Sequence, residues 1–464
     1  MRKSVIVLEF NELSPSLMDK FIGQGRLPNF ARLRDQSAVY TTDAEEAAPN
    51  LEPWIQWVTV HTGLGFEQHG VFELDRGVDL NAPRIWDLVS AAGGSAFVCG
   101  SMNPGYLPGL RGAIVPDPWS TRAAPYPERT FDTYYDYVRR NVQEHSREKS
   151  PVSPQDHLKF LAFMLNHGLS WKTISRTVSQ LASERGGKFR WRRATILDRL
   201  QWDVFSHYWR RHRPTYATFF LNSTAHFQHY YWRNLQPELF ALKPAAGEQA
   251  EYENAVLFGY QSMDQLAGEC LQMAGPDTAI VLCSALSQQP CVAWEEKGGK
   301  VSYRPHDFDA LLRWAGVSGA WRSAPIMSEQ FHLYFSDAAS AADAARKLES
   351  IEVGEINGEK AMLARCEGNQ IYAGCKLFHQ VNESDRIVCR ETGAEARFFD
   401  LFYRISGMKS GMHHPDGILW ISQSAKEARK PGGRISLRRV MPMLLDLVGV
   451  PVPVESTEVP ASRS

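Results

Sequence analysis

Long apolar segments are absent from the sequence. No uninterrupted apolar run approaches the roughly 20 residues that a membrane-spanning helix needs. The N-terminal segment has two basic residues and then an apolar run of only four before Glu9, which is too short for the apolar part of a signal peptide. We therefore expect no membrane span, a buried strand near the N-terminus and a cytoplasmic protein.

A strong net charge and a cysteine framework are also missing. The chain has 51 basic and 52 acidic residues, so its formal net charge of -1 predicts no general attraction to nucleic acid. The seven cysteines are odd in number and none forms a CxxC pair, which argues against a disulfide framework and a cysteine-bound zinc. Free thiols in a reducing compartment are expected.

Strand and helix patterns alternate in the first part of the chain. The runs SVIVLEF, SAVYTTDA and SAFVCG are typical of strands, and segments with apolar residues at helical spacing separate them. Ser14 and Pro15 are typical of a helix start, with the Ser14 oxygen expected to cap the helix. This alternation predicts an α/β fold of three α/β/α layers with a mainly parallel central sheet.

The patterns divide the chain, whose 464 residues are 44% apolar, into a core and two insertions. We expect core α/β segments at 1–120, 201–290 and 396–453, a helical insertion or cap at 121–200, a small α+β insertion at 291–395 and a disordered tail at 454–464.

A basic stretch, KFRWRRATILDR, closes the predicted helical insertion. Such a charge run is typical of a solvated helix face. The functional alternative is a contact between residues 190–193 and an anionic ligand or partner, such as a sugar phosphate or a protein.

Six segments, in their order and spacing, carry a resemblance to a known family. They are GRLPNFARL, HTGLGFEQHGVF, IWDLVSAAGGSAFVCG, TAHFQHYYWR, GMHHPDGILWIS and MPMLLDLVGVPVP. Together they resemble the alkaline phosphatase superfamily, and within it the type I phosphodiesterase/nucleotide pyrophosphatase branch. The resemblance implies phosphoryl transfer with two divalent ions, usually zinc, which Asp and His side chains hold beside a Thr or Ser nucleophile at a helix N-terminus.

The expected nucleophile has no Ser or Thr counterpart in this chain. The matching stretch, NLEPWIQW, offers Glu52 or Pro53 at the start of the helix. Five roles are open for the Glu52 carboxylate. It is a covalent nucleophile, a metal ligand, a general base, a permanent occupant of the anion site or a plain helix cap. Asn11 stands where the family has its first Asp ligand, and Glu9 shares that face of the strand. Glu52, Asn11 and Glu9 are therefore the candidate catalytic residues.

Two histidines of the family pattern are kept, while apolar residues replace other ligands. His229 and His413 match metal-ligand positions. Ala225, Ala285 and Leu286 stand where the family has Asp, Asp and His. Because these side chains cannot bind a cation, the metal-site motifs are degenerate and a two-metal mechanism is not expected.

The retained histidines predict a single divalent metal, zinc or manganese. A stable zinc site needs three or four protein ligands. The third ligand is expected to be His226 or Glu12, with Glu9 and Glu52 as further candidates. A protein without bound metal remains the alternative.

Two functions follow from this pattern. The first is a divergent enzyme that acts on a phosphate ester or phosphodiester, glycan-linked substrates included, without the usual two-metal site. The second is a catalytically inactive relative, a pseudoenzyme, that serves as a binding or regulatory module. Metal-free cleavage of a glycan by paired carboxylates is a third possibility. The expected partners are a small molecule or sugar phosphate, or a protein, and no nucleic acid.

Overall fold

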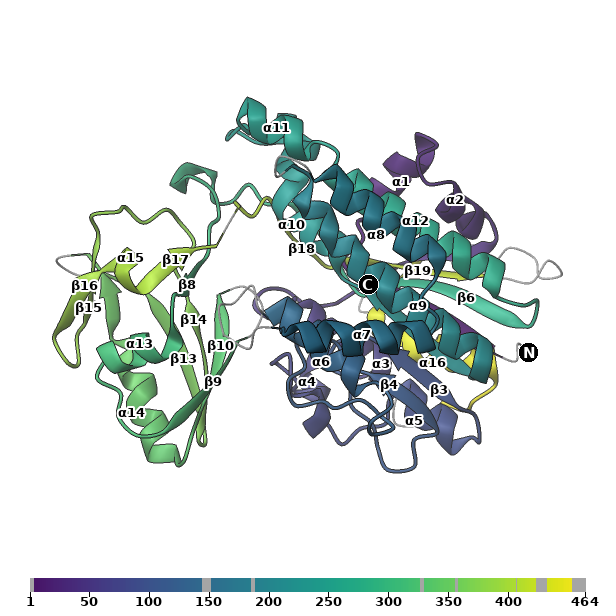
Figure 1. Ribbon diagram of the computed structural model, residues 1–464, viewed down its shortest axis with the longest axis horizontal. Helices are drawn as coiled ribbons and strands as arrows, with labels where there is room; N and C mark the ends of the chain where they lie inside the picture. The colour runs from purple at the N-terminus through teal and green to yellow at the C-terminus, as the bar shows by residue number, and fades with distance from the viewer. Residues whose placement is uncertain are drawn as a thin grey trace, which may run out of the picture.

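The computed structural model describes residues 4–143, 152–184, 188–325, 329–354, 358–405, 407–422 and 432–452. Figure 1 shows a central sheet between two layers of helices, with a smaller unit beside this core. The expected three-layer α/β fold is confirmed. The predicted tail at 454–464 lies outside the described residues.

The central sheet has eight strands and is mainly parallel. Within the described ranges, antiparallel pairing in this sheet involves only β19, which lies between β2 and β6. The spatial order is β20 (Arg434–Ser436), β2 (Ser37–Asp43), β19 (Asp416–Ser422), β6 (Thr278–Ser284), β1 (Ser4–Phe10), β5 (Tyr216–Leu221), β3 (Ala96–Cys99) and β4 (Gly112–Val115).

The buried strand β1 separates two apolar cores because its side chains alternate between the faces of the sheet. Ile6 and Leu8 pack with the helices of one layer, and Val5 and Val7 pack with those of the other. The first layer contains α1 (Pro15–Gly23), α2 (Pro28–Asp35), α9 (Ala194–His212), α10 (Ser223–Leu235) and α12 (Ala255–Met273). The second contains α3 (Pro53–Thr62), α5 (Ile85–Ala91) and α16 (Val440–Val448).

Short elements extend these layers. The helix α4 (Phe66–His69) follows α3, and α11 (Ala246–Tyr252) follows α10. Beyond the sheet, β7 (Ser287–Pro290) pairs with β18 (Gly411–His414). The first helix begins at Pro15 as predicted, but the Ser14 hydroxyl makes no capping hydrogen bond and lies 3.0 Å from the Ser16 hydroxyl instead.

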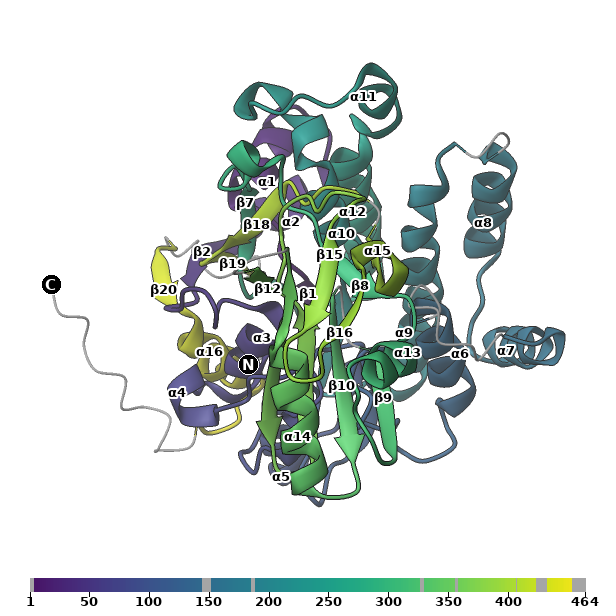
Figure 2. The same cartoon turned by 90° about the vertical axis from the view of Figure 1, so that its left-hand side faces the viewer.

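Helices dominate the segment between β4 and β5. Figure 2 shows α7 and α8 on one side of the molecule, next to α9. The bounds are α6 (Asp132–Gln143), α7 (Pro154–Asn166) and α8 (Trp171–Ser183). Ser153 and Ser170 cap α7 and α8 by accepting backbone N–H groups.

The small unit has its own apolar core and two antiparallel sheets of four strands. This core includes Phe398 and Phe402, so the unit continues beyond the expected end at residue 395. Its elements are β8 (Tyr303–Pro305), α13 (Phe308–Trp314), β9 (Trp321–Pro325), β10 (Gln330–Phe335), α14 (Ala338–Glu349), β11 (Ile351–Val353), β12 (Glu359–Lys360), β13 (Met362–Glu367), β14 (Gln370–Cys375), β15 (Arg386–Cys389), β16 (Ala394–Arg397), α15 (Phe398–Leu401) and β17 (Phe402–Arg404).

None of the helices in the described ranges combines the length and the apolar character that a bilayer-spanning segment needs. All seven cysteines lie in these ranges as free thiols, and each except Cys366 is buried.

Candidate active site

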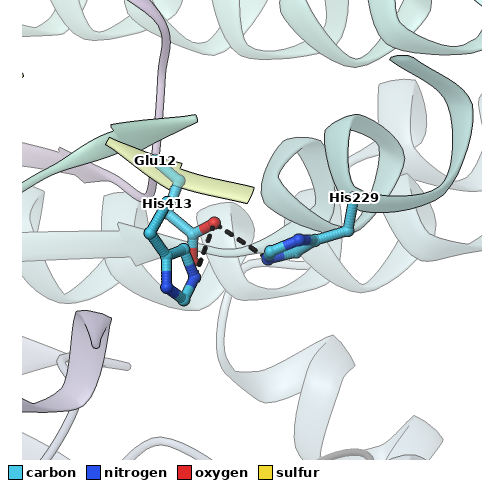
Figure 3. Close-up of side chains that lie close together, drawn as sticks. All are labelled: Glu12, His229 and His413. Carbon is cyan, nitrogen blue, oxygen red and sulfur yellow. Dashed lines mark ion pairs between the residues drawn. The ribbon is translucent and has the colours of Figure 1, made fainter. Parts of the chain in front are cut away.

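Three side chains from distant parts of the sequence converge beyond the end of β1. Glu12 follows β1, His229 lies on α10 and His413 lies on β18. Figure 3 shows both imidazole rings directed at one carboxylate: Glu12 Oε2 lies 3.0 Å from His229 Nε2 and 3.6 Å from His413 Nε2. We call Glu12, His229 and His413 the core cluster. The sequence had marked both histidines and proposed Glu12 as one choice for the third ligand.

Glu12 is held in place by its neighbour Asn11. The Asn11 amide donates to Glu12 Oε1 at 2.9 Å and to Asn222 Oδ1 at 2.7 Å, while its oxygen accepts the Trp57 Nε1–H at 2.8 Å. Glu12 also has a left-handed backbone, with φ of 59°, which non-glycine residues seldom adopt. Asn11 is thus fully hydrogen-bonded and acts on the site through Glu12.

The orientation of both imidazole rings is fixed by backbone carbonyl groups. His229 Nδ1 lies 3.1 Å from the Gly411 oxygen, and His413 Nδ1 lies 2.9 Å from the Leu51 oxygen. A carbonyl oxygen only accepts hydrogen bonds, so each Nδ1 carries a proton and donates it. In the neutral ring, Nε2 then presents its lone pair to Glu12, which is the usual arrangement of a metal-binding histidine.

The donor set fits one divalent cation. In the neutral form, His229 Nε2 and Glu12 Oε2 are both acceptors, yet they lie 3.0 Å apart. Such a contact is favourable only when a cation or a proton lies between the two atoms. Two imidazole nitrogens and a carboxylate oxygen are ligands that zinc accepts, and all three lie within 4.8 Å of one another.

The charges of the core cluster are strongly coupled. Burial opposes ionisation of Glu12, but His413 and His229 outweigh it and hold the pKa of this carboxyl well below its usual range. Burial also lowers the pKa of His229. For His413, burial is outweighed by the carboxylates of Glu12 and Glu52, which raise its pKa to about 9.

Glu52 lies beside this cluster at the N-terminus of α3. Its Oε2 atom is 3.5 Å from His413 Nδ1, and its side chain is 30% exposed. Glu52 is the N-cap residue of α3, but its side chain makes no capping hydrogen bond. Burial raises the pKa of Glu52 despite the opposing charge of His413, and the Glu12 carboxylate raises it further.

Two other sequence candidates have different surroundings. Glu9 is fully buried, with one oxygen 2.9 Å from His61 Nε2 and the other accepting the Ser101 hydroxyl at 2.5 Å. His226 is exposed and its ring lies 4.8 Å from that of Tyr230. Neither belongs to the core cluster, so Glu12 and not His226 is the third group beside the two histidines.

The positions where the family resemblance implied further metal ligands are apolar and buried. Ala225 is 1% exposed, and Ala285 and Leu286 are fully buried. Their side chains offer no ligand atom, and the Ala225 carbonyl accepts the Gln288 amide at 3.0 Å. The Gln288 amide also donates to Glu12.

Comparisons with known proteins decide the family. The family model described as type I phosphodiesterase / nucleotide pyrophosphatase matches residues 5–301, which is more than half of the chain. The chain belongs to this family. A search of curated proteins found no match.

The solved structures that align with this chain have low sequence identity and low TM-scores. Phosphonoacetate hydrolase from Sinorhizobium meliloti 1021, in complex with phosphonoformate, is 13% identical with a TM-score of 0.43. Human ectonucleotide pyrophosphatase / phosphodiesterase 5 is 9% identical with a TM-score of 0.43. Both alignments cover 97% of this chain and 96% of the other.

A second group of ionisable side chains in this phosphodiesterase-family chain lies where the small unit meets the core. His332 on β10 has its Nε2 atom 3.5 Å from both Glu73 Oε2 and Asp75 Oδ1. Its Nδ1 atom lies 2.9 Å from the amide nitrogen of Gln370, whose oxygen accepts from Arg76 at 3.0 Å. We call Glu73, Asp75 and His332 the interface cluster.

Sequence reasoning missed the interface cluster and Gln288, whose amide donates to Glu12. His332 and Asp75 are far apart in the chain, and neither lies in the six segments that carry the family resemblance. Gln288 had a usable signal, because SQQP lies only two residues after the core strand TAIVLCS. Polar residues at the carboxyl end of a core strand often face a ligand site.

Proposed function

We propose that this chain cleaves phosphate esters or phosphodiesters at the core cluster, with one divalent metal, zinc or manganese. The observation that carries the proposal is the convergence of Glu12 Oε2, His229 Nε2 and His413 Nε2, with both rings oriented by Nδ1 hydrogen bonds. A divalent metal bound there supplies positive charge that stabilises the negative charge of a phosphoryl group.

Glu52 is the proposed general base. Its carboxylate lies at the positive end of α3 and makes no capping hydrogen bond. Its raised pKa brings its basicity closer to that needed near neutral pH. In this role Glu52 accepts the proton of the attacking hydroxyl group or water. Asn11 is a positioning residue, because its amide orients Glu12.

The second candidate is an inactive relative that binds a phosphorylated ligand without cleaving it. The buried Ala225, Ala285 and Leu286 favour this alternative, since they leave no ligand atom for a second metal at those positions. A single metal with three protein ligands is compatible with binding alone.

Hydrolysis of nitrophenyl phosphate and of bis-nitrophenyl phosphate by protein reloaded with zinc or manganese tests the proposal. We expect metal-dependent release of nitrophenolate. Glu52→Gln should lower kcat by about 10²–10⁴ and leave the metal content unchanged, as expected for loss of a general base. The control Glu253→Gln, an exposed glutamate outside the site, should behave like the wild type.

The outcomes separate the two candidates. Metal-loaded protein that binds nitrophenyl phosphate but turns over neither ester would support the inactive relative. Turnover that is equal in wild type and Glu52→Gln would remove Glu52 from the mechanism.

A further inference from the structure

A cavity of about 440 Å³ lies between α8, α9 and α12, within the helical layer. Pockets of roughly 300–1,000 Å³ are typical for small-molecule ligands. None of its lining residues belongs to the core cluster or the interface cluster. Figure 2 shows α8 beside α9, on a different side of the molecule from β18.

Three guanidinium groups line this cavity. Arg176 comes from α8, Arg199 from α9, and Arg192 from the short 3-10 helix Arg190–Arg193. No carboxylate occurs among the described residues that line it. The other polar lining groups are hydroxyls and amides, among them those of Thr177, Ser179, Gln180, Thr195, Gln261 and Ser262.

Arg199 is the strongest indication of an anionic ligand. It is 6% exposed, and its Nη2 atom donates to Glu269 at 2.8 Å. Its Nε and Nη1 atoms are buried and have no hydrogen-bond partner among the described residues. Since buried donors of a charged group are costly when unsatisfied, this arrangement suits an acceptor that enters the cavity.

The positive charge around Arg199 is only partly balanced. Glu269 also accepts a hydrogen bond from Lys172, so one carboxylate serves two cations. Arg176 donates to the neutral side chain of Gln265. Burial lowers the pKa of Arg176, and the neighbouring charge of Arg199 lowers it further.

Arg192 adds a rigid planar donor at the wall of the cavity. Its guanidinium carbon lies 4.2 Å from the ring centre of Phe189 and 5.1 Å from that of Phe258. Its Nε atom is buried without a hydrogen-bond partner among the described residues. A stacked guanidinium is pre-organised to bind phosphate oxygens.

We propose that this cavity binds a phosphorylated small molecule that carries hydroxyl groups, such as a sugar phosphate. The guanidinium groups of Arg176, Arg192 and Arg199 take the phosphate, and the hydroxyl and amide side chains bind the hydroxyl groups of the ligand. The basic stretch at residues 190–193 thus contributes to a ligand site in addition to its solvated face.

Isothermal titration calorimetry on the full chain tests this site, with EDTA present to keep metal out of the core cluster. The probes are glucose phosphate, glycerol phosphate, inositol phosphate, inorganic phosphate and unphosphorylated glucose. We expect at least one of the three phosphate esters to bind once per chain, more tightly than inorganic phosphate and than glucose.

Substitutions locate the binding. Arg199→Gln and Arg176→Gln should each weaken the binding of the phosphate ester by about 10- to 100-fold, the loss typical of a charged hydrogen bond. Arg176 is exposed, so its variant reports on binding even where Arg199→Gln fails to fold. The matched control is Arg211→Gln, which replaces an exposed arginine on α9, the helix of Arg199. This variant should bind the ester like the wild type.

Three results would overturn the proposal. They are no binding of any of the three esters, equal affinity in wild type and Arg176→Gln, and inorganic phosphate that binds as tightly as the esters. Loss of hydrolysis at the core cluster would leave these measurements unaffected, because they need no metal and no turnover.

Discussion

The core cluster and the interface cluster contain the same kinds of side chain at similar separations, but their histidines differ at the second ring nitrogen. In the core cluster, Nδ1 of both rings donates to a carbonyl oxygen, so Nε2 is available as a ligand. In the interface cluster, His332 Nδ1 faces the amide N–H of Gln370 and must accept from it.

The Gln370 amide has its orientation fixed from both ends. Its oxygen accepts from Arg76, and its nitrogen also lies 3.3 Å from Glu73 Oε2. His332 Nε2 therefore carries the proton and points it toward Glu73 and Asp75. A triad of metal-binding residue types therefore forms a metal site only when the second nitrogen of each ring donates to an acceptor, which leaves the other nitrogen free to bind the metal.

Metal content separates the two clusters most strongly. We expect about one zinc or manganese per chain after reconstitution, lost almost completely in His229→Ala and retained in the matched variant His332→Ala. The physical reason is that His229 presents an Nε2 lone pair to the Glu12 carboxylate, whereas His332 carries its proton on Nε2. Elemental analysis of the dialysed proteins measures the metal content per chain. Metal that persists in His229→Ala, or disappears in His332→Ala, would contradict the comparison.

Titration of the metal-free protein should separate the clusters by pH. The pKa of His413 is raised from 6.5 to about 9, so its contribution to stability is complete below pH 6.5 and is lost as the pH rises toward 9. At 1.36 kcal/mol per pKa unit, this loss is roughly 3 kcal/mol. Burial raises the pKa of Asp75, but the neighbouring His332 ring, the Thr121 hydroxyl and the Arg122 charge together outweigh it, and the net pKa is lowered from 3.8. The contribution of Asp75 is therefore present above pH 3.8 and is lost on acidification.

Unfolding by urea between about pH 3, below the ordinary pKa of an Asp carboxyl, and about pH 10, one unit above the pKa of His413, measures the acid loss and the alkaline loss of stability. His413→Gln should remove most of the alkaline loss, and Asp75→Asn should reduce the acid loss. An alkaline loss that survives in His413→Gln would show that another group titrates there.

Much of the fold follows from local patterns in the sequence. The alternation of buried strands and amphipathic helices is a property of neighbouring residues, and so are the starts of α1 and α3 at Pro15 and Pro53. The end of the small unit was missed because Phe398 and Phe402 pack against residues far away in the chain. Periodicity carries no information about which core a phenylalanine joins.

The candidate site could be predicted only in part from the sequence, for the same reason. His229 and His413 stand in recognisable motifs, whereas Glu12 lies in a turn whose left-handed backbone cannot be read from EFNELSP. Glu9 was grouped with Asn11 from strand alternation. The strand ends at Phe10, before Asn11, and Glu9 contacts the His61 ring, a residue 52 positions away in the chain.

Removal of the His332 ring should weaken the contact between the small unit and the core. His332→Ala removes the ring that accepts the Gln370 amide and lies 3.5 Å from Glu73 and Asp75, and we expect a loss of about 1–3 kcal/mol of stability, typical of buried polar groups that lose a partner. Urea unfolding measures the loss. The exposed His226→Ala is the control and should change stability by less than about 0.5 kcal/mol. Equal stability of the two variants would mean that the interface cluster does not hold the unit in place.

A single substitution should convert the interface cluster into a weak metal site. In Gln370→Glu, the new carboxylate can accept the Nδ1 proton of His332 while it keeps its contact with Arg76, so Nε2 would present its lone pair to Glu73 and Asp75. The new carboxylate would also lie close to the Glu73 carboxylate and repel it, and a bound cation would relieve this repulsion. In a His229→Ala background, zinc at ten times Kd should stabilise this variant by about 1.4 kcal/mol. The same zinc should leave His229→Ala alone unchanged. If zinc stabilised both proteins equally, the proton on His332 Nε2 could not be what keeps metal out of the interface cluster.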